Sequence, residues 1–266
     1  MLLRTLDSRA GAAWNGPDAG PVTCFLLHHA GGSAASFAEF PRHFPPAWRL
    51  RAVELPGRGS AIDRAPCIGT ADAVAQLLPL ILAEAEACRF AVFGHSLGAL
   101  VAYELVRALE RAGTPPAWLG VSAMPGPALV RRRFPQRRDR WPRERLVEFI
   151  RQVGGTPVEM LDDEATVDYI VKVLRQDLAV VDTYEFVPGN RLGVPLSVFW
   201  GDQDPLTERS MVEDWRHHCA APVEYHCWPG GHFFLFDQVP RLAEAMTSGV
   251  RRARLGSFGT LAGRPA

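Results

Sequence analysis

A pentapeptide at residues 94–98 (GHSLG) stands between the apolar run 90–93 and a stretch with helical periodicity. The pattern G-x-S-x-G in that setting is typical of a serine held at a sharp turn between a strand and a helix. A glycine on either side leaves room for neighbouring backbone to approach closely. The pattern therefore predicts strand, turn and helix, with Ser96 as a nucleophile. On the pentapeptide alone, a chance match in which Ser96 only caps the helix stays open.

Apolar runs of strand length alternate with helical stretches along the chain. The strand-like runs are 22–27, 49–54, 90–93, 118–123, 194–200 and 223–228, and the clearest helical stretches are 71–87, 97–111, 208–218 and 240–253. This alternation favours an α/β fold with a mostly parallel central sheet and helices on both faces. At 266 residues and 47% hydrophobic content, the chain suits one domain over 1–255, with a disordered tail expected at 256–266.

A nucleophilic serine needs a histidine base and an acid, and in such folds the chain order is serine, acid, histidine. The turn GDQDP at 201–205 follows an apolar run, and we predict Asp204 as the acid from its place in the pattern G-x-x-D. Asp202 is the rival, which we expect to cap the turn. His232 follows two glycines after the run 223–228, and it is the predicted base.

Acyl transfer also needs backbone donors aimed at the developing oxyanion. The N–H of Leu97, directly after the nucleophile, is one predicted donor. The other is the N–H of Ala30, in the loop 28–33 (HHAGGS) after the first core strand. A flexible turn that merely opens the next helix is the alternative interpretation of that loop. We expect His95 to pack beside Ser96 rather than act as the base.

Five motifs appear in one order along the chain: HAGGS at 29–33, LPGRG at 55–59, GHSLG at 94–98, GDQDP at 201–205 and GHF at 231–233. Together they resemble the type II thioesterases, stand-alone α/β-hydrolases associated with polyketide synthases and nonribosomal peptide synthetases. The resemblance covers roughly residues 22 to 250. The segment LRQDL at 174–178, followed by Tyr184 and Glu185, is also similar to a segment of that family.

The resemblance implies hydrolysis of acyl thioesters from the phosphopantetheine arm of an acyl or peptidyl carrier protein, in an editing or housekeeping role. Two departures bear on pocket shape and acyl preference. His28 stands where the family usually has proline, and the segment 122–125 (SAMP) stands where an arginine and an Ala-Pro pair are more typical. Neither departure touches the predicted triad or the oxyanion donors.

The chain between residues 123 and 194 is far longer than an ordinary connection, which predicts a helical lid at about 125–190. Two sets of apolar residues recur there at helical spacing, and they either line an acyl pocket or bury themselves on the core. They are Leu146, Phe149, Ile150 and Val153, and then Tyr169, Ile170, Val173, Leu174 and Leu178.

The predicted lid also carries a cluster of arginines. They are Arg131, Arg132, Arg133, Arg137, Arg138, Arg140 and Arg143. Guanidinium groups pair well with carboxylate and phosphate, so the cluster is a candidate docking surface for an acidic carrier protein. A solvated face is the alternative, because charge runs usually have no partner.

Composition excludes several function classes. Lys+Arg 29 balance Asp+Glu 29, so we expect neither nucleic acid nor membrane as a partner. The first residues include charged side chains and no apolar run approaches the length of a membrane span, which predicts a cytoplasmic protein. The five cysteines lack C-x-x-C spacing, so neither a disulfide framework nor a zinc site is predicted. No nucleotide-binding motif is present, and we expect no cofactor.

Three other functions use similar sequence features. A general carboxylesterase or lipase has the same triad, because function depends on the site rather than on the fold. A product-releasing acyl transferase or cyclase forms the same acyl-enzyme and passes it to an internal nucleophile. A binding protein built on a hydrolase scaffold is the third, and the complete set Ser96, Asp204 and His232 disfavours it.

Overall fold

The computed structural model describes residues 1–6, 20–85 and 89–259. Within these residues, seven strands form one sheet in the order β1-β3-β2-β4-β5-β6-β7, and all neighbours run parallel except β1, which is antiparallel to β3. The strands are β1 (Leu2–Leu6), β2 (Val22–Leu27), β3 (Trp48–Glu54), β4 (Phe90–His95), β5 (Leu119–Ser122), β6 (Leu196–Gly201) and β7 (Val223–Trp228). The predicted mostly parallel sheet is confirmed.

Strand β1 is the one strand of the described sheet that the sequence did not predict. It pairs with the outer side of β3, and its middle residues, Arg4 and Thr5, are exposed to solvent. An edge strand of five residues with polar side chains has neither the continuous apolar run nor the clear alternation by which the other strands stand out.

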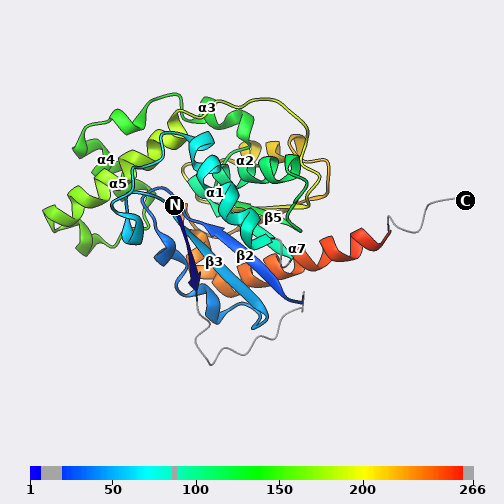
Figure 1. The fold of residues 1–266 in the computed structure, drawn as a ribbon. Helices are drawn as coiled ribbons and strands as arrows, with labels where there is room; N and C mark the ends of the chain where they lie inside the picture. The colour runs from blue at the N-terminus through cyan, green and yellow to red at the C-terminus, as the bar shows by residue number, and fades with distance from the viewer. Residues whose placement is uncertain (7–19, 86–88, 260–266) are drawn as a thin grey trace, which may run out of the picture.

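Helices cover both faces of the sheet, as expected (Figure 1). On one face, α1 (Thr70–Ala85) and α2 (Leu97–Arg111) pack in a core that includes Phe25 and Leu27 of β2. On the other, α7 (Val239–Gly259) and the 3-10 helices η1 (Ala34–Phe37) and η2 (Phe40–Arg42) pack in a core that includes Cys24 and Leu26. Successive side chains of β2 therefore enter opposite cores, which explains why this strand is apolar throughout.

Several predicted boundaries shift by one or two residues, and two predictions in the C-terminal half differ more. Helix α7 continues to Gly259, beyond the expected start of a tail at 256, and residues 260–266 lie outside the described part of the chain. The predicted helix 208–218 is divided into α6 (Arg209–Glu213) and the 3-10 helix η7 (Asp214–His217). Boundaries of this kind depend on tertiary packing more than on apolar spacing.

The chain between β5 and β6 forms a helical insertion, which we define as residues 125–190. It contains α3 (Val130–Arg133), α4 (Arg143–Val153) and α5 (Glu164–Asp182), with the 3-10 helices η4 (Pro127–Leu129), η5 (Arg138–Arg140) and η6 (Val158–Leu161). The apolar faces of α4 and α5 pack on each other. The insertion lies to one side of the sheet, where α4 and α5 project from the body in Figure 1. The remaining 3-10 helices are η3 (Gly59–Ala61) and η8 (Phe234–Gln238).

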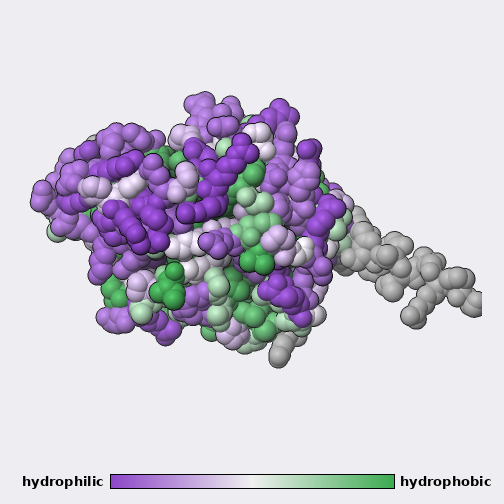
Figure 2. Space-filling model, turned by 90° about the horizontal axis from the view of Figure 1, so that it is seen from above, coloured by the Kyte–Doolittle hydropathy of each residue, from purple (hydrophilic) through white to green (hydrophobic). Residues whose placement is uncertain are grey.

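Large apolar side chains are concentrated in the interior. Seen from above in Figure 2, the surface is mostly hydrophilic, with hydrophobic residues in small patches between the polar ones. Of the described helices, none combines the length and the hydropathy that crossing a bilayer requires. Cys24, Cys67 and Cys219 are buried free thiols and Cys227 is an exposed one, whereas Cys88 lies outside the described residues.

Candidate active site

The turn between β4 and α2 holds Ser96 in a strained conformation, with φ of 55° and ψ of −119°. Such a conformation costs a non-glycine residue about 1–3 kcal/mol and persists only when its surroundings enforce it. A Cβ at Gly94 would lie 2.1 Å from the Gly98 carbonyl oxygen, and one at Gly98 would lie 2.1 Å from the Leu27 carbonyl oxygen. The Ser96 side chain makes no cap to α2, so the helix-cap interpretation is not supported.

Two loops at the carboxyl ends of β6 and β7 bring an acid and a histidine to this serine. The Ser96 Oγ lies 2.9 Å from His232 Nε2, and His232 Nδ1 lies 2.9 Å from Asp204 Oδ2. Asp204 also accepts hydrogen bonds from the Leu206 N–H at 2.8 Å and the Thr207 hydroxyl at 2.6 Å. The Asp204 and His232 side chains are nearly inaccessible to solvent. The structure thus joins the three predicted residues in one hydrogen-bonded chain.

The rival carboxylate has a different role in the structure. Asp202 Oδ1 accepts a hydrogen bond from the Gly230 N–H at 3.0 Å, which ties the end of β6 to the loop that carries His232. Within the described residues, no hydrogen bond joins Asp202 to His232. The geometry therefore favours Asp204 over Asp202 as the partner of the imidazole.

Two backbone N–H groups near Ser96 are available to a ligand. Leu97 is the first residue of α2, and the first N–H groups of a helix have no acceptor within the helix. Ala30 lies in the loop after β2, and it lines the same cavity as Ser96. Among the described residues, neither N–H donates a hydrogen bond. These are the two N–H groups that the sequence predicts for the oxyanion.

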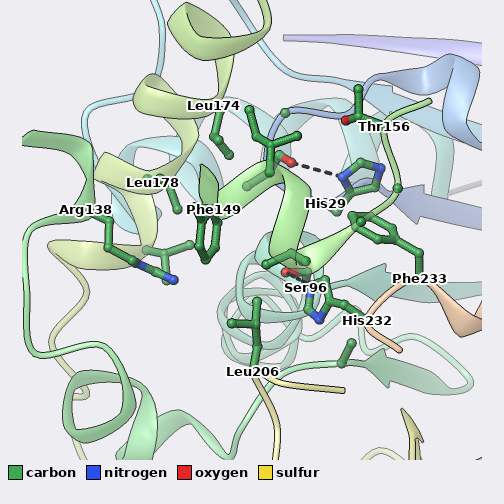
Figure 3. Close-up of a pocket in the computed structure, with 18 of the residues that line it drawn as sticks. His29, Ser96, Arg138, Phe149, Thr156, Leu174, Leu178, Leu206, His232 and Phe233 are labelled. Carbon is green, nitrogen blue, oxygen red and sulfur yellow. Dashed lines mark hydrogen bonds between the residues drawn. The ribbon is translucent and has the colours of Figure 1, made fainter. Parts of the chain in front are cut away.

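A cavity of about 90 Å³ lies between the triad and the insertion. Figure 3 shows Ser96 and His232 close together, with Phe149, Leu174 and Leu178 of the insertion across from them. Six of the predicted lid residues line the cavity, namely Phe149, Ile150, Val153, Ile170, Leu174 and Leu178.

The other three predicted lid residues do not line the cavity. Leu146 is buried between α4 and α5, and Val173 is buried outside the cavity lining. Tyr169 is 43% exposed, because it lies on the outer side of α5. Helical spacing alone thus identifies an apolar face without saying which part of it faces a cavity.

One buried ion pair near the site was not predicted. Arg58 donates to both carboxylate oxygens of Asp177 at 2.5 Å, and it also donates to the Gly32 carbonyl at 3.0 Å. Asp177 accepts a further hydrogen bond from the Gly31 N–H at 2.7 Å. The pair therefore joins α5 to the loop that carries Ala30. Both charged residues stand in motifs recognised in the sequence, LPGRG and LRQDL, but nothing in either motif indicates that they pair.

Most arginines of the predicted docking cluster are engaged within the protein. Arg138 forms a buried pair with Asp182, and Arg133 donates to the carbonyls of Pro205 and Leu206 at 2.6 and 2.9 Å. Arg131 donates to the backbone carbonyl of Asp182, and Arg137 and Arg143 form ion pairs with Asp139 and Asp168. Within the described residues, the guanidinium groups of Arg132 and Arg140 make no hydrogen bond or ion pair, and both residues are exposed.

Three further histidines surround the site as neutral groups. Burial lowers the pKa of His29 to about 4 and the pKa values of His28 and His95 well below the ordinary range. His95 Nδ1 lies 3.0 Å from the Ser122 hydroxyl, a contact that joins the ends of β4 and β5. Its ring centroid lies 5.2 Å from that of His232.

Comparison with known proteins agrees with this geometry. A thioesterase domain family model matches residues 22–248. Thioesterase PikA5 of Streptomyces venezuelae is 37% identical over 222 residues, which cover 82% of this chain and 76% of that protein.

Solved structures of thioesterases share the fold. The type II thioesterase BorB from the borrelidin biosynthetic cluster superposes with a TM-score of 0.81 at 28% identity, covering 94% of this chain and 97% of that one. The RedJ thioesterase from the prodiginine pathway of Streptomyces coelicolor superposes with a TM-score of 0.79 at 29% identity, covering 92% of each chain. Since the family match runs from β2 into α7 and includes every residue of the hydrogen-bonded chain, this protein belongs to the thioesterase domain family.

Proposed function

We propose that the protein hydrolyses acyl thioesters carried on the phosphopantetheine arm of an acyl or peptidyl carrier protein, as an editing thioesterase of polyketide or nonribosomal peptide biosynthesis. The observation that carries this proposal is the chain Ser96–His232–Asp204, which opens on an apolar cavity closed by the insertion. The similarity to PikA5 and BorB supports it.

The first half of the reaction forms an acyl-enzyme. His232 Nε2 takes the hydroxyl proton of Ser96 as Oγ attacks the thioester carbonyl carbon, and Asp204 stabilises the imidazolium that results. The carbonyl oxygen becomes an oxyanion, which the N–H groups of Ala30 and Leu97 stabilise. When the carbon–sulfur bond breaks, the phosphopantetheine thiolate takes the proton from His232 and leaves as the thiol.

The second half releases the acid. A water molecule gives a proton to the same imidazole and attacks the acyl carbon of the Ser96 ester. The second tetrahedral oxyanion occupies the same position, and its collapse returns the proton to Ser96 Oγ and frees the carboxylic acid. No group other than the triad and the two N–H donors is needed for either half.

The enclosed cavity beside Ser96 is small. Its volume of about 90 Å³ is well below the roughly 300–1,000 Å³ of pockets that enclose drug-sized ligands. A cyclising enzyme must hold a chain long enough to fold back on its own ester. The enclosed cavity suits an acyl group of a few carbon atoms, and a hollow of about 570 Å³ that shares Val153, His232 and Phe233 with it is open to solvent.

Docking of the carrier protein is part of the proposal, and the charge pattern limits where it takes place. Arg132 and Arg140 are the two arginines of the cluster whose guanidinium groups have no partner in the described residues. Their charge is therefore free to meet the acidic surface of a carrier protein. The other arginines of the cluster bond within the protein, either inside the insertion or, for Arg133, to the loop that carries Asp204.

A comparison of substrates tests the proposed function. Wild type and Ser96→Ala are assayed with the same acyl group on a carrier protein, on coenzyme A and as a p-nitrophenyl ester. We expect Ser96→Ala to lose at least about 10⁴-fold in kcat, and wild type to favour the carrier-bound thioester. Preference for the p-nitrophenyl ester would instead indicate a general esterase, and unchanged turnover by Ser96→Ala would refute the triad.

Two carboxylate variants provide a matched control. Asp204→Asn removes the acceptor that orients the imidazole, and we expect a loss of about 10²–10⁴-fold in kcat. Asp202→Asn leaves an oxygen that still accepts from the Gly230 N–H, so its activity stays within about threefold of wild type. The reverse ranking would assign the acid to Asp202.

A further inference from the structure

The peptide bond between His29 and Ala30 is held at its carbonyl oxygen by two donors. The His28 Nδ1 lies 2.8 Å from the His29 carbonyl oxygen, and the Gly32 N–H donates to the same oxygen at 3.0 Å. In a trans peptide, the carbonyl and the N–H point in opposite directions. Fixing the His29 carbonyl on one side of the loop therefore fixes the direction of the Ala30 N–H on the other.

The next peptide bond is fixed as well. The carbonyl oxygen of this peptide belongs to Ala30 and lies 3.0 Å from His29 Nδ1. A dashed line marks this contact in Figure 3. The N–H of the same peptide, that of Gly31, donates to Asp177. Of the four polar groups in these two peptides, only the Ala30 N–H makes no hydrogen bond within the described residues. The loop is thus built to leave that one donor free beside Ser96.

The protonation of His28 follows from its surroundings. A carbonyl oxygen only accepts, so Nδ1 must carry the hydrogen. The ring is 1% exposed, and among the described residues its Nε2 has no hydrogen-bond partner. Leaving a buried ring nitrogen unpaired is costly, which makes a purely structural preference for histidine at this position difficult to explain. Burial keeps the imidazole neutral.

We propose that His28 is a positioning residue for oxyanion stabilisation. Its Nδ1–H holds the His29 carbonyl away from the cavity, so that the peptide cannot turn over and aim that carbonyl at the developing negative charge. This inference rests on the proposed function in one respect, the role of the Ala30 N–H as an oxyanion donor. The proline more typical of the family restricts the backbone by its ring, whereas this chain uses a hydrogen bond.

Two variants of similar size separate the hydrogen bond from packing. His28→Leu removes the donor, and we expect kcat to fall about 10- to 100-fold with KM within about twofold, because only the transition state carries the oxyanion. His28→Asn places an amide N–H where Nδ1 stands, and we expect it to recover kcat to within about threefold of wild type. A His28→Leu protein with wild-type kcat would overturn the proposal, as would equal losses in both variants.

A trifluoromethyl ketone with a short acyl group links these losses to the oxyanion. Its adduct with Ser96 carries the negative oxygen, so its affinity should weaken in proportion to kcat/KM across wild type, His28→Asn and His28→Leu. Loss of activity with undiminished affinity for the ketone would refute the positioning role. The affinity for the ketone depends on the oxyanion site whichever ester or thioester the enzyme prefers. The measurement therefore distinguishes a failure of the positioning role from a failure of the proposed thioesterase function.

A further test measures the ring in the unaltered protein and needs a variant only to assign its signal. In protein labelled with ¹⁵N in its histidines, His28 should show a protonated Nδ1 and an unprotonated Nε2, and should stay neutral under mildly acidic conditions. The opposite tautomer would remove the donor on which the proposal depends. The assignment of the signal comes from its absence in His28→Asn.

Discussion

At the scale of single residues, the site depends on imidazole rings that are kept neutral by burial. His28, His29 and His95 all have lowered pKa values, and desolvation is the largest cause for each. Two of them use a ring nitrogen to fix backbone carbonyls of the loop after β2. A protonated ring would place a positive charge in a buried site, and for His28 and His29 that charge would lie near the Arg58 guanidinium. The histidines therefore make the folded site sensitive to acid.

We predict that stability falls as the pH falls below about 6.5, the ordinary pKa of histidine in an unfolded chain. Below that value the unfolded protein binds protons that the buried rings do not, so each ring lowers the free energy of unfolding by up to about 1.4 kcal/mol per pH unit. For His29 the loss continues down to a pH of about 4. Urea unfolding at a series of pH values between these limits measures the slope.

The variant His29→Gln provides the comparison. It removes one of the titrating rings, so its free energy of unfolding should change less steeply with pH over the same interval. Identical slopes for the two proteins would show that His29 is not kept neutral by the fold.

At the scale of elements, the strand, turn and helix around Ser96 could be predicted because their signals are local. An apolar run, two glycines and helical spacing lie within one short stretch, and the structure reproduces them as β4, the strained Ser96 and α2. The order of Asp204 and His232 after the serine along the chain completed the predicted triad. Strand β1 had no comparable local signal, since it has neither a continuous apolar run nor a clear alternation of apolar and polar residues.

The buried pair between Arg58 and Asp177 shows what local signals leave out. These residues are 119 positions apart, and their contact depends on how α5 crosses the loop after β2. The sequence marked both segments as motifs, yet charge and spacing alone did not indicate that one side chain binds the other. The contact between the two side chains depends on the tertiary structure, in which α5 of the insertion packs near the loop after β2.

We predict that Asp177→Asn destabilises the protein by about 3–5 kcal/mol and lowers kcat, because Arg58 loses its counter-ion while remaining buried. The double variant Arg58→Met/Asp177→Leu should recover much of that stability, since apolar pairs often replace buried ion pairs without loss. It should not recover kcat, because leucine at position 177 offers the Gly31 N–H no acceptor. Urea unfolding and steady-state kinetics on the three proteins check both statements.

Recovery of both quantities in the double variant would contradict a role of α5 in holding the loop. In that case the pair would contribute only to stability, and the loop after β2 would keep its conformation through its own hydrogen bonds.

At the scale of the whole molecule, the active site lies between the carboxyl edge of the sheet and the insertion. The sheet supplies Ser96, Asp204 and His232, and the insertion supplies most of the apolar wall of the cavity. The sequence predicted both contributions, but the size of the cavity could not be predicted from it. That size depends on how α4 and α5 pack, and helical spacing does not specify such packing.

We predict that Phe149→Ala shifts the preference toward longer acyl groups, because the ring lies in the cavity wall (Figure 3). Each methylene newly accommodated contributes about 0.8 kcal/mol, or roughly fourfold in kcat/KM. A series of acyl thioesters of increasing chain length measures the change.

Leu146→Ala is the matched control on the same helix. Leu146 packs between α4 and α5 and does not line the cavity, so the substitution should cost about 2–5 kcal/mol of stability without altering the chain-length preference. An equal shift in preference for both variants would mean that chain length is not selected by this wall.

The contacts of Arg133 with the carbonyls of Pro205 and Leu206 have a consequence for transplanting parts between relatives. Asp177 of the insertion also binds the loop after β2. The insertion is therefore anchored on both sides of the catalytic centre. A chimera that receives this insertion without Arg58 would inherit a new acyl wall together with a misplaced oxyanion loop. Substrate range can therefore be exchanged between relatives only when the insertion is transferred together with the residues outside it that anchor it.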